Sequence, residues 1–314
     1  MDVSTKLEKL DSCYSTKVGD GSLSFGGKWT GDTEVEERLR RLQSSGESIK
    51  QAVTKVTMMR SAPVTASNMT VYVELDTALN SMVNDFQAIC ERCSVSKMLL
   101  EVVYKVVQAV FSRVKELVDL VQVSVSAEKG SEGSAGRTAP MATGMVWSAC
   151  DELRKLPTSN KAVYRWVVLN SILTVKDTVE EYSKYVADAK MSRGEGPNDG
   201  DDDDDDDDEP YSIEETSIVE DVVLQISGVQ QTLRSTLQSM SQAAEVGGWG
   251  DSEEGQQTLA YLVAAVQFMS GRVVNLASEL HSPFDMTVIA AKRTDVEEGL
   301  ASIAEIALGM PSST

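Results

Sequence analysis

The feature that most constrains the fold of this chain is a series of long segments in which apolar residues recur every third or fourth position. The first clear series consists of Val35, Leu39, Leu42, Ile49, Val53 and Val56. Gly46 occupies the missing place in that series. Such a repeat puts its side chains on one face of an α-helix, so it predicts a long amphipathic helix that ends before Pro63.

The next two segments also predict long helices. Residues 67–93 keep the three- and four-residue spacing of apolar positions. Residues 98–125 are apolar on most sides, and their many Val residues would also suit strands. No Gly or Pro interrupts that segment, which is much longer than an ordinary strand, so we expect a central, well-buried helix.

The remaining apolar segments complete an all-α pattern. Helices are predicted over residues 141–156, 160–191, 213–246, 253–281 and 283–308. Thr294 and Glu297 suit a capping box, so the last segment is either one kinked helix or two shorter ones. Because no stretch alternates like a strand between hairpin turns, we predict an all-α chain with an N-terminal up-down bundle of long helices and a C-terminal helical unit.

Changes of composition suggest where the domains begin and end. Gly and Ser crowd the first thirty or so residues, so residues 1–31 are expected to be mostly disordered and residues 32–191 to form the N-terminal bundle. Ten acidic residues lie between Asp199 and Glu209. Mutual repulsion without apolar surface predicts an acidic disordered linker over residues 192–211, followed by a helical domain over 212–309 and a tail over 310–314.

The charge balance limits the partners and the compartment. Lys and Arg total 29 against 49 for Asp and Glu, which gives a formal charge of −20. A field of this sign repels phosphate backbones and anionic lipid headgroups, so we expect no direct binding to nucleic acid or membranes. The first residues lack the apolar stretch of a secretory signal, and apolar runs such as residues 259–269 are shorter than the ~18 residues of a membrane span. The expected location is the cytoplasm and nucleus.

The reactive side chains do not predict a catalytic, metal or cofactor site. His281 is the only histidine, and its position near a helix end suits a contact with the helix dipole. Cys90 and Cys93 form a C-x-x-C pair without the further ligands of a zinc site or the strand of a redox motif. Two small apolar side chains on one helix face are the simpler interpretation, and reversible oxidation is the alternative. We therefore predict a protein that is not an enzyme and has no cofactor.

Ser212 is a candidate phosphorylation site. The acidic run precedes it, and Glu214 and Glu215 follow it. An acidophilic kinase recognises such a setting, and the phosphate would add charge to an already acidic segment.

A series of motifs in the middle of the chain has a recognisable order. It consists of Val146, Trp147, Ala149 and Cys150, then Pro157, then Asn160 and Lys161, and finally Val175, Lys176, Asp177, Glu180 and Glu181. In this order, and with an acidic segment after it, the series resembles the cyclin-D1-binding protein 1 family, also called GCIP. The order and lengths of the predicted helices and loops resemble those of the family over roughly residues 32–306. Individual residues match the motifs of the family only in this central part.

The resemblance implies a non-enzymatic interaction protein that binds D-type cyclins, helix-loop-helix transcription factors or both, and so restrains cell-cycle progression or transcription. Within the motifs, Trp147 is expected to anchor neighbouring helices and Pro157 to end a helix. Asn160 is expected to cap the next helix, with Ser159 as the alternative cap. The candidates for the partner surface are Lys161, Lys176, Asp177, Glu180 and Glu181. A solvated charged face is the alternative interpretation of those five.

The physical mode implied for partner binding is helix-in-groove packing, in which an amphipathic partner helix lies between bundle helices. Two other classes remain open. Long-helix bundles of the vinculin and α-catenin type share this architecture, so a cytoskeletal adaptor is the first alternative. A helical enzyme is the second, although the sequence shows no converging acid, base or metal ligands.

Overall fold

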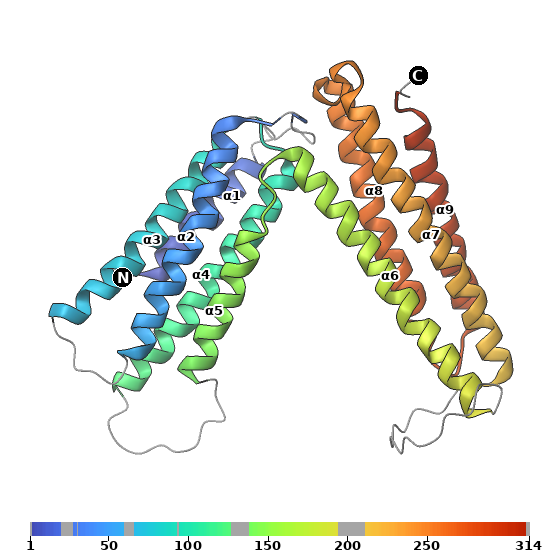
Figure 1. Cartoon of the computed structure of the whole chain (residues 1–314), viewed down its shortest axis with the longest axis horizontal. Coiled ribbons are helices and arrows are strands. Elements are labelled where there is room, and N and C mark those ends of the chain that lie inside the picture. The colour runs from blue at the N-terminus through green and yellow to red at the C-terminus, as the bar shows by residue number, and fades with distance from the viewer. Residues whose placement is uncertain are drawn as a thin grey trace. The chain divides into compact units, whose positions relative to one another are not determined.

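All regular elements in the described part of the chain are helices, which confirms the all-α class (Figure 1). The structure is a computed structural model, and it describes residues 2–19, 28–29, 31–59, 66–92, 94–126, 138–193 and 211–311. The chain divides into two compact units, residues 1–163 and 164–314. Most of the predicted acidic linker, residues 194–210, lies outside the described residues.

The N-terminal unit is an up-down bundle, as predicted. Its helices are α1 (Val3–Gly19), α2 (Thr33–Met58), α3 (Ala66–Cys90), α4 (Lys97–Ser126) and α5 (Ala139–Arg154). The helices α2 to α5 run alternately up and down (Figure 1), and α2 packs against both α3 and α5. The segment expected to be a central helix is α4, whose residues from Leu99 to Val121 supply a continuous series of buried positions.

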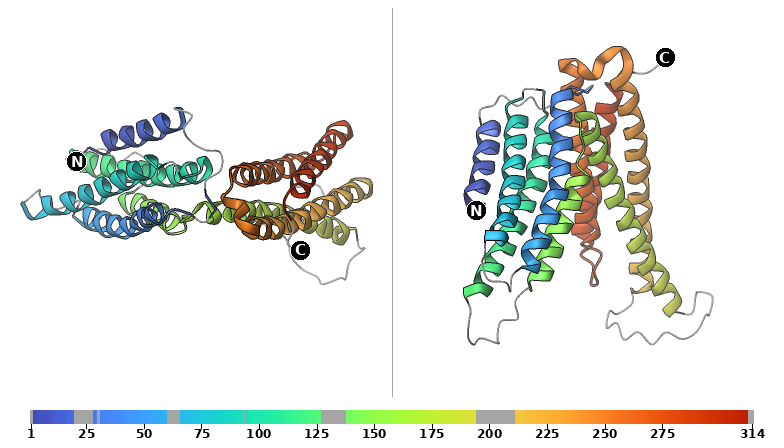
Figure 2. Two further views of the ribbon diagram at one scale, coloured as in Figure 1. Left: turned by 90° about the horizontal axis from the view of Figure 1, so that it is seen from above. Right: turned by 60° about the vertical axis from the view of Figure 1, so that its left-hand side comes forward.

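The structure differs from the expectation for the first residues, because α1 is a helix of 17 residues. It packs on α3 and α4, on the side away from α2 and α5 (Figure 2). Val3 and Leu10 are buried, and the Tyr14 ring stacks on Tyr104 with centroids 3.9 Å apart. The Tyr104 hydroxyl donates a hydrogen bond of 2.9 Å to Asp11. The glycines of this segment all follow position 18, so they do not interrupt α1. Packing of the apolar face of α1 on α3 and α4 then stabilises the helix.

The C-terminal unit contains most of α6 (Asn160–Ser192), which enters the unit at Tyr164. Its other elements are α7 (Ile213–Glu245), the 3₁₀ turn η1 (Val246–Asp251), α8 (Glu253–Ala277) and α9 (Met286–Leu308). The helix α8 packs against α7 and α9. Gly247 and Gly248 have φ values of 56° and 75° at the turn, a backbone region that favours glycine. The helix α9 is continuous, and Thr294 donates to the Ala290 carbonyl inside it, so of the two alternatives for this segment the single helix is confirmed.

The boundary between the units also differs from the expected one. It falls between Val163 and Tyr164, inside α6, and not at the acidic run. The later part of α6 belongs with the C-terminal helices, since the Tyr182 hydroxyl donates to the Ala277 carbonyl over 2.6 Å and Lys190 pairs with Glu220. The acidic run marks a change of composition, whereas the unit boundary depends on which apolar faces pack together.

Candidate protein-interaction surface

The side of α6 that faces away from its unit carries large apolar side chains in contact with solvent. Trp166, Leu169 and Leu173 are 40%, 46% and 52% exposed. Their spacing of three and four residues places them on one face, while Val168, Val175 and other positions on the opposite face are buried. We call these three exposed residues the α6 stripe. Contiguous exposed apolar side chains are a common mark of a binding surface.

The sequence did not single out the α6 stripe. Its three residues belong to a wide apolar pattern that we would assign to a helix with neighbours on two sides. Among the described residues of the C-terminal unit, the neighbouring helices cover only the opposite side of this part of α6. A sequence pattern that could have revealed the stripe is the i, i+3, i+7 spacing of Trp166, Leu169 and Leu173. This spacing places them on a different helix face from the buried residues of α6.

Four of the five predicted partner residues continue the α6 stripe toward the C-terminus of the helix. Lys176 forms an ion pair of 2.9 Å with Glu180, and this hydrogen bond raises the pKa of Lys176. Asp177 and Glu181 are exposed, and the Tyr185 hydroxyl lies 3.5 Å from Glu181. Asp177 and Glu180 follow Leu173 by four and seven residues, so they share the face of the stripe. The surface is therefore an apolar stripe with an acidic end.

The fifth predicted partner residue, Lys161, does not join this surface. It lies in the first turn of α6 and within the N-terminal unit. Its Nζ atom is 5.4 Å from the centroid of the buried Trp29 ring, in the position of a cation–π contact. Lys161 is partly buried and covers an aromatic side chain, so the charged face of the later α6 residues is a separate feature.

Asn160 holds chain segments together and does not cap its own helix, which corrects the expectation. Ser159 is the cap, because its hydroxyl accepts from the Ala162 N–H over 3.1 Å. The buried Asn160 side chain accepts from the Ser96 N–H over 3.0 Å and donates to the carbonyls of Lys28 (3.0 Å) and Ser94 (2.9 Å). It thus fixes the start of α6 to the segment before α2 and to the connection between α3 and α4.

Further polar contacts extend this arrangement to the first turns of two more helices. Asp32 caps α2, and its carboxylate also accepts a hydrogen bond of 2.6 Å from Ser94. That bond from Ser94 is the main reason why the pKa of Asp32 lies below its usual range. Ser96 caps α4 through the Leu99 N–H. The N-termini of α2, α4 and α6 are therefore joined by one network of side chains.

Trp147 is not the buried anchor that the motif suggested. Its side chain is 44% exposed on α5. The core face of α5 is formed by residues such as Val146, Cys150 and Leu153, and Trp147 lies one position beyond that face. Val146 therefore provides the core packing that was expected of the tryptophan.

Cys150 and Gly46 mark a close approach of α5 and α2. A Cβ atom at Gly46 would lie 3.5 Å from the Cys150 carbonyl oxygen and 3.4 Å from a methyl carbon of Leu153. Ala149 is half-buried beside this contact, and the buried Pro157 follows the end of the helix. Burial raises the pKa of the Cys150 thiol to about 12, so the thiol stays protonated at neutral pH.

The other reactive groups differ in their burial. Burial raises the pKa of Cys90 to about 12, and Cys93 falls outside the described residues. His281 is exposed in the connection between α8 and α9. Within the described ranges, no group of three or more His, Cys, Asp or Glu side chains has the arrangement of a metal site.

Ser212 is the N-cap of α7 and forms a capping box. Its hydroxyl accepts from the Glu215 N–H over 3.2 Å, and the Glu215 carboxylate accepts from the Ser212 N–H over 3.0 Å. Ser282 donates to the same carboxylate over 2.7 Å. These hydrogen bonds, with that from the Ser212 backbone the largest, lower the pKa of Glu215. Ser212 is exposed, and its phosphorylation stays a prediction.

One described helix, α8, is long and apolar enough to cross a membrane by length and composition alone. Within its most apolar window, 44% of the residues are buried in the unit. Core helices of bundles pass the same test, and α8 packs against α7 and α9. The expectation of no membrane binding therefore stays a prediction.

Comparisons with known proteins point to the family that the motifs resemble. Residues 41–188 match the family model described as Grap2 and cyclin-D-interacting, N-terminal. A relative from Xenopus laevis named Cyclin-D1-binding protein 1 homolog is 26% identical over 199 residues, which cover 62% of this chain and 58% of the relative. A relative of the same name from Danio rerio is 26% identical over 190 residues, or 60% of this chain and 52% of the relative.

The alignments thus span a little more than half of the length of each relative. The family match contains α5, most of α6 and all the motif residues from Val146 to Glu181. The order of the motifs, the helical fold and these comparisons agree, and residues 41–188 of the chain are similar to the Grap2 and cyclin-D-interacting protein family.

Proposed function

We propose that this chain is a non-enzymatic regulator that binds D-type cyclins, helix-loop-helix proteins or both, and so restrains cell-cycle progression or transcription in the cytoplasm and nucleus. The observation that carries the proposal is the α6 stripe, which lies inside the segment matched by the family model. The names of the two relatives support cyclin D1 as a partner. The buried, protonated thiols support a role without catalysis.

The α6 stripe suits an amphipathic partner helix. Trp166, Leu169 and Leu173 present an apolar strip along the helix axis, and the acidic end formed by Asp177 and Glu180 selects a basic or hydrogen-bond-donating neighbour. Full burial of one such side chain contributes ~1.5–3 kcal/mol, and each of the three is about half-exposed. Covering the stripe would therefore contribute about 3 kcal/mol, or roughly a hundredfold in affinity.

The test is a binding measurement with purified cyclin D1 and with a purified helix-loop-helix domain. We expect the variant Trp166→Ala/Leu169→Ala/Leu173→Ala to bind the true partner about a hundredfold more weakly than the wild type. Leu224→Ala is the matched control, since Leu224 is an exposed leucine on α7 and is 74% exposed. Equal affinity of the triple variant and the wild type would contradict the proposed surface.

A second experiment separates the proposed function from that of a cytoskeletal adaptor. Affinity purification from the native cell, followed by mass spectrometry, should recover a cyclin or a helix-loop-helix protein with the wild type and lose it with the triple variant. Recovery of actin-associated proteins alone, with cosedimentation of the chain with actin filaments, would favour the adaptor. Imaging of the tagged chain tests the proposed cytoplasmic and nuclear location.

A further inference from the structure

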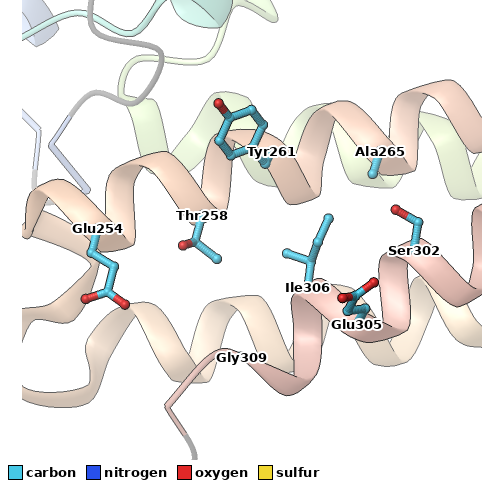
Figure 3. A pocket seen from close by; sticks show the side chains of 8 residues that line it. All are labelled: Glu254, Thr258, Tyr261, Ala265, Ser302, Glu305, Ile306 and Gly309. Carbon is cyan, nitrogen blue, oxygen red and sulfur yellow. The ribbon is translucent and has the colours of Figure 1, made fainter.

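A groove lies between α8 and the C-terminal end of α9, outside the segment matched by the family model (Figure 3). It has a volume of about 580 Å³, within the range of ligand-binding pockets. Ala265 and Ile306 supply apolar surface, and Ile306 points from α9 toward α8. Thr258 and Ser302 add hydroxyl groups. We call this feature the α8–α9 groove.

Two carboxylates give the α8–α9 groove its charge. Glu254 lies in the first turn of α8, and Glu305 lies near the end of α9. Among the described residues, neither carboxylate has an ion-pair or hydrogen-bond partner, and no Lys or Arg lines the groove. This differs from α2, where Glu36 and Glu37 pair with Arg40 and Arg41. The two groove carboxylates are therefore available to a cation from outside.

The C-terminus of α9 adds to this preference. Gly309, at the end of α9, also lines the groove. The last carbonyl groups of a helix carry partial negative charge and attract cations.

We propose that the α8–α9 groove binds a Lys- or Arg-bearing helical segment of a partner protein. Glu254 and Glu305 lie toward different ends of the groove (Figure 3), so two basic side chains of the segment would meet them, one at each carboxylate. The methylene stems of those side chains would pack on Ile306 and Ala265. The ring of Tyr261, which also lines the groove and is exposed, adds an aromatic face for the cation. This site is distinct from the α6 stripe, and the proposal does not rest on the function proposed above.

The probe is a fluorescent 18-residue synthetic helix made of Leu and Lys, and fluorescence anisotropy measures its affinity for the full chain. We expect Glu254→Gln/Glu305→Gln to weaken binding about tenfold, because two charge-assisted contacts are lost while the side-chain shapes remain. The control Glu253→Gln/Glu298→Gln removes the same charge from the same two helices at exposed positions that do not line the groove. It should bind the peptide as the wild type does.

Two results would overturn the proposal. In the first, both double variants lose the same amount of affinity. In the second, neither variant loses any, which would mean that the peptide is held by the general negative charge of the chain, for example by the acidic run between Asp199 and Glu209. Circular dichroism of each variant checks that the helices remain intact. Because α6 is unchanged in these variants, their cyclin and helix-loop-helix binding tests the other proposal separately.

Discussion

Replacing Asn160 with alanine should destabilise the N-terminal unit far more than the loss of an ordinary surface amide. The substitution removes the acceptor of the buried Ser96 N–H and the donor to the carbonyls of Lys28 and Ser94. An alanine side chain offers none of these partners. The effect should be felt at the start of α4 and of α6 together, because Asn160 connects them.

The magnitude follows from the three hydrogen bonds. Each contributes ~1 kcal/mol net, and a buried N–H without a partner costs ~1–3 kcal/mol. If the Ser96 N–H costs about 2 kcal/mol and each partly buried carbonyl about 0.5 kcal/mol, the free energy of unfolding should fall by about 3 kcal/mol. Ser159→Ala is the matched control, because it removes only the α6 cap and should cost ~1 kcal/mol.

The assay combines urea denaturation with hydrogen exchange of single amides. Exchange is needed because the chain has two compact units, so that one unfolding curve need not be two-state. In Asn160→Ala, the amide of Ser96 should lose protection, whereas in Ser159→Ala it should keep it. A loss of stability no greater than that of the control, with unchanged protection at Ser96, would refute the reasoning.

Three further predictions concern single side chains. Arg38→Ala should lower the free energy of unfolding, measured by urea denaturation, by about 2–3 kcal/mol. The substitution leaves the buried Asp85 carboxylate without the guanidinium that lies 2.9 Å away. Because Arg38 itself is partly exposed, the loss should be smaller than that for a fully buried ion pair. The pKa of Asp32 is lowered in the folded state, so its contribution to stability is present above its ordinary pKa and is lost as the pH falls through its pKa in the folded state. In denaturation curves recorded from pH 7 to 2, the free energy of unfolding should therefore fall less steeply with acid for Asp32→Asn than for the wild type. Ser212→Ala should lower the free energy of unfolding by ~1 kcal/mol, because it removes the N-cap of α7. Hydrogen-exchange protection in the first turn of α7 equal to that of the wild type would contradict this prediction.

The helices could be predicted because their apolar spacing is long and regular. The expected helix over residues 98–125 agrees with α4 to within one residue at each end, since no turn residue competes inside it. The helix α1 was missed because the glycines after position 18 dominated the composition of residues 1–31. The spacing of Val3, Leu10 and Tyr14 was the signal against disorder, and it became decisive only with α3 and α4 present to cover that face.

The candidate surface was less predictable than the fold. Trp147 and Trp166 both occur in apolar helical patterns, and the spacing alone does not say which face the neighbouring helices cover. The surface position of Lys176, Asp177, Glu180 and Glu181 could be predicted, because charged residues on a helix face are exposed by default, and their role in partner binding stays a prediction. The role of Asn160 was missed because its partners, Lys28, Ser94 and Ser96, are more than sixty residues away in sequence.

The position of the unit boundary inside α6 has a consequence for dissecting the chain. A cut within residues 194–210, which composition alone would recommend, leaves α6 on one fragment and α7, α8 and α9 on the other. The second fragment would expose the apolar surface that Tyr182 and its neighbours cover in the intact unit. We expect the two fragments to aggregate when expressed alone and to reassociate when expressed together, because only together do they complete the C-terminal unit.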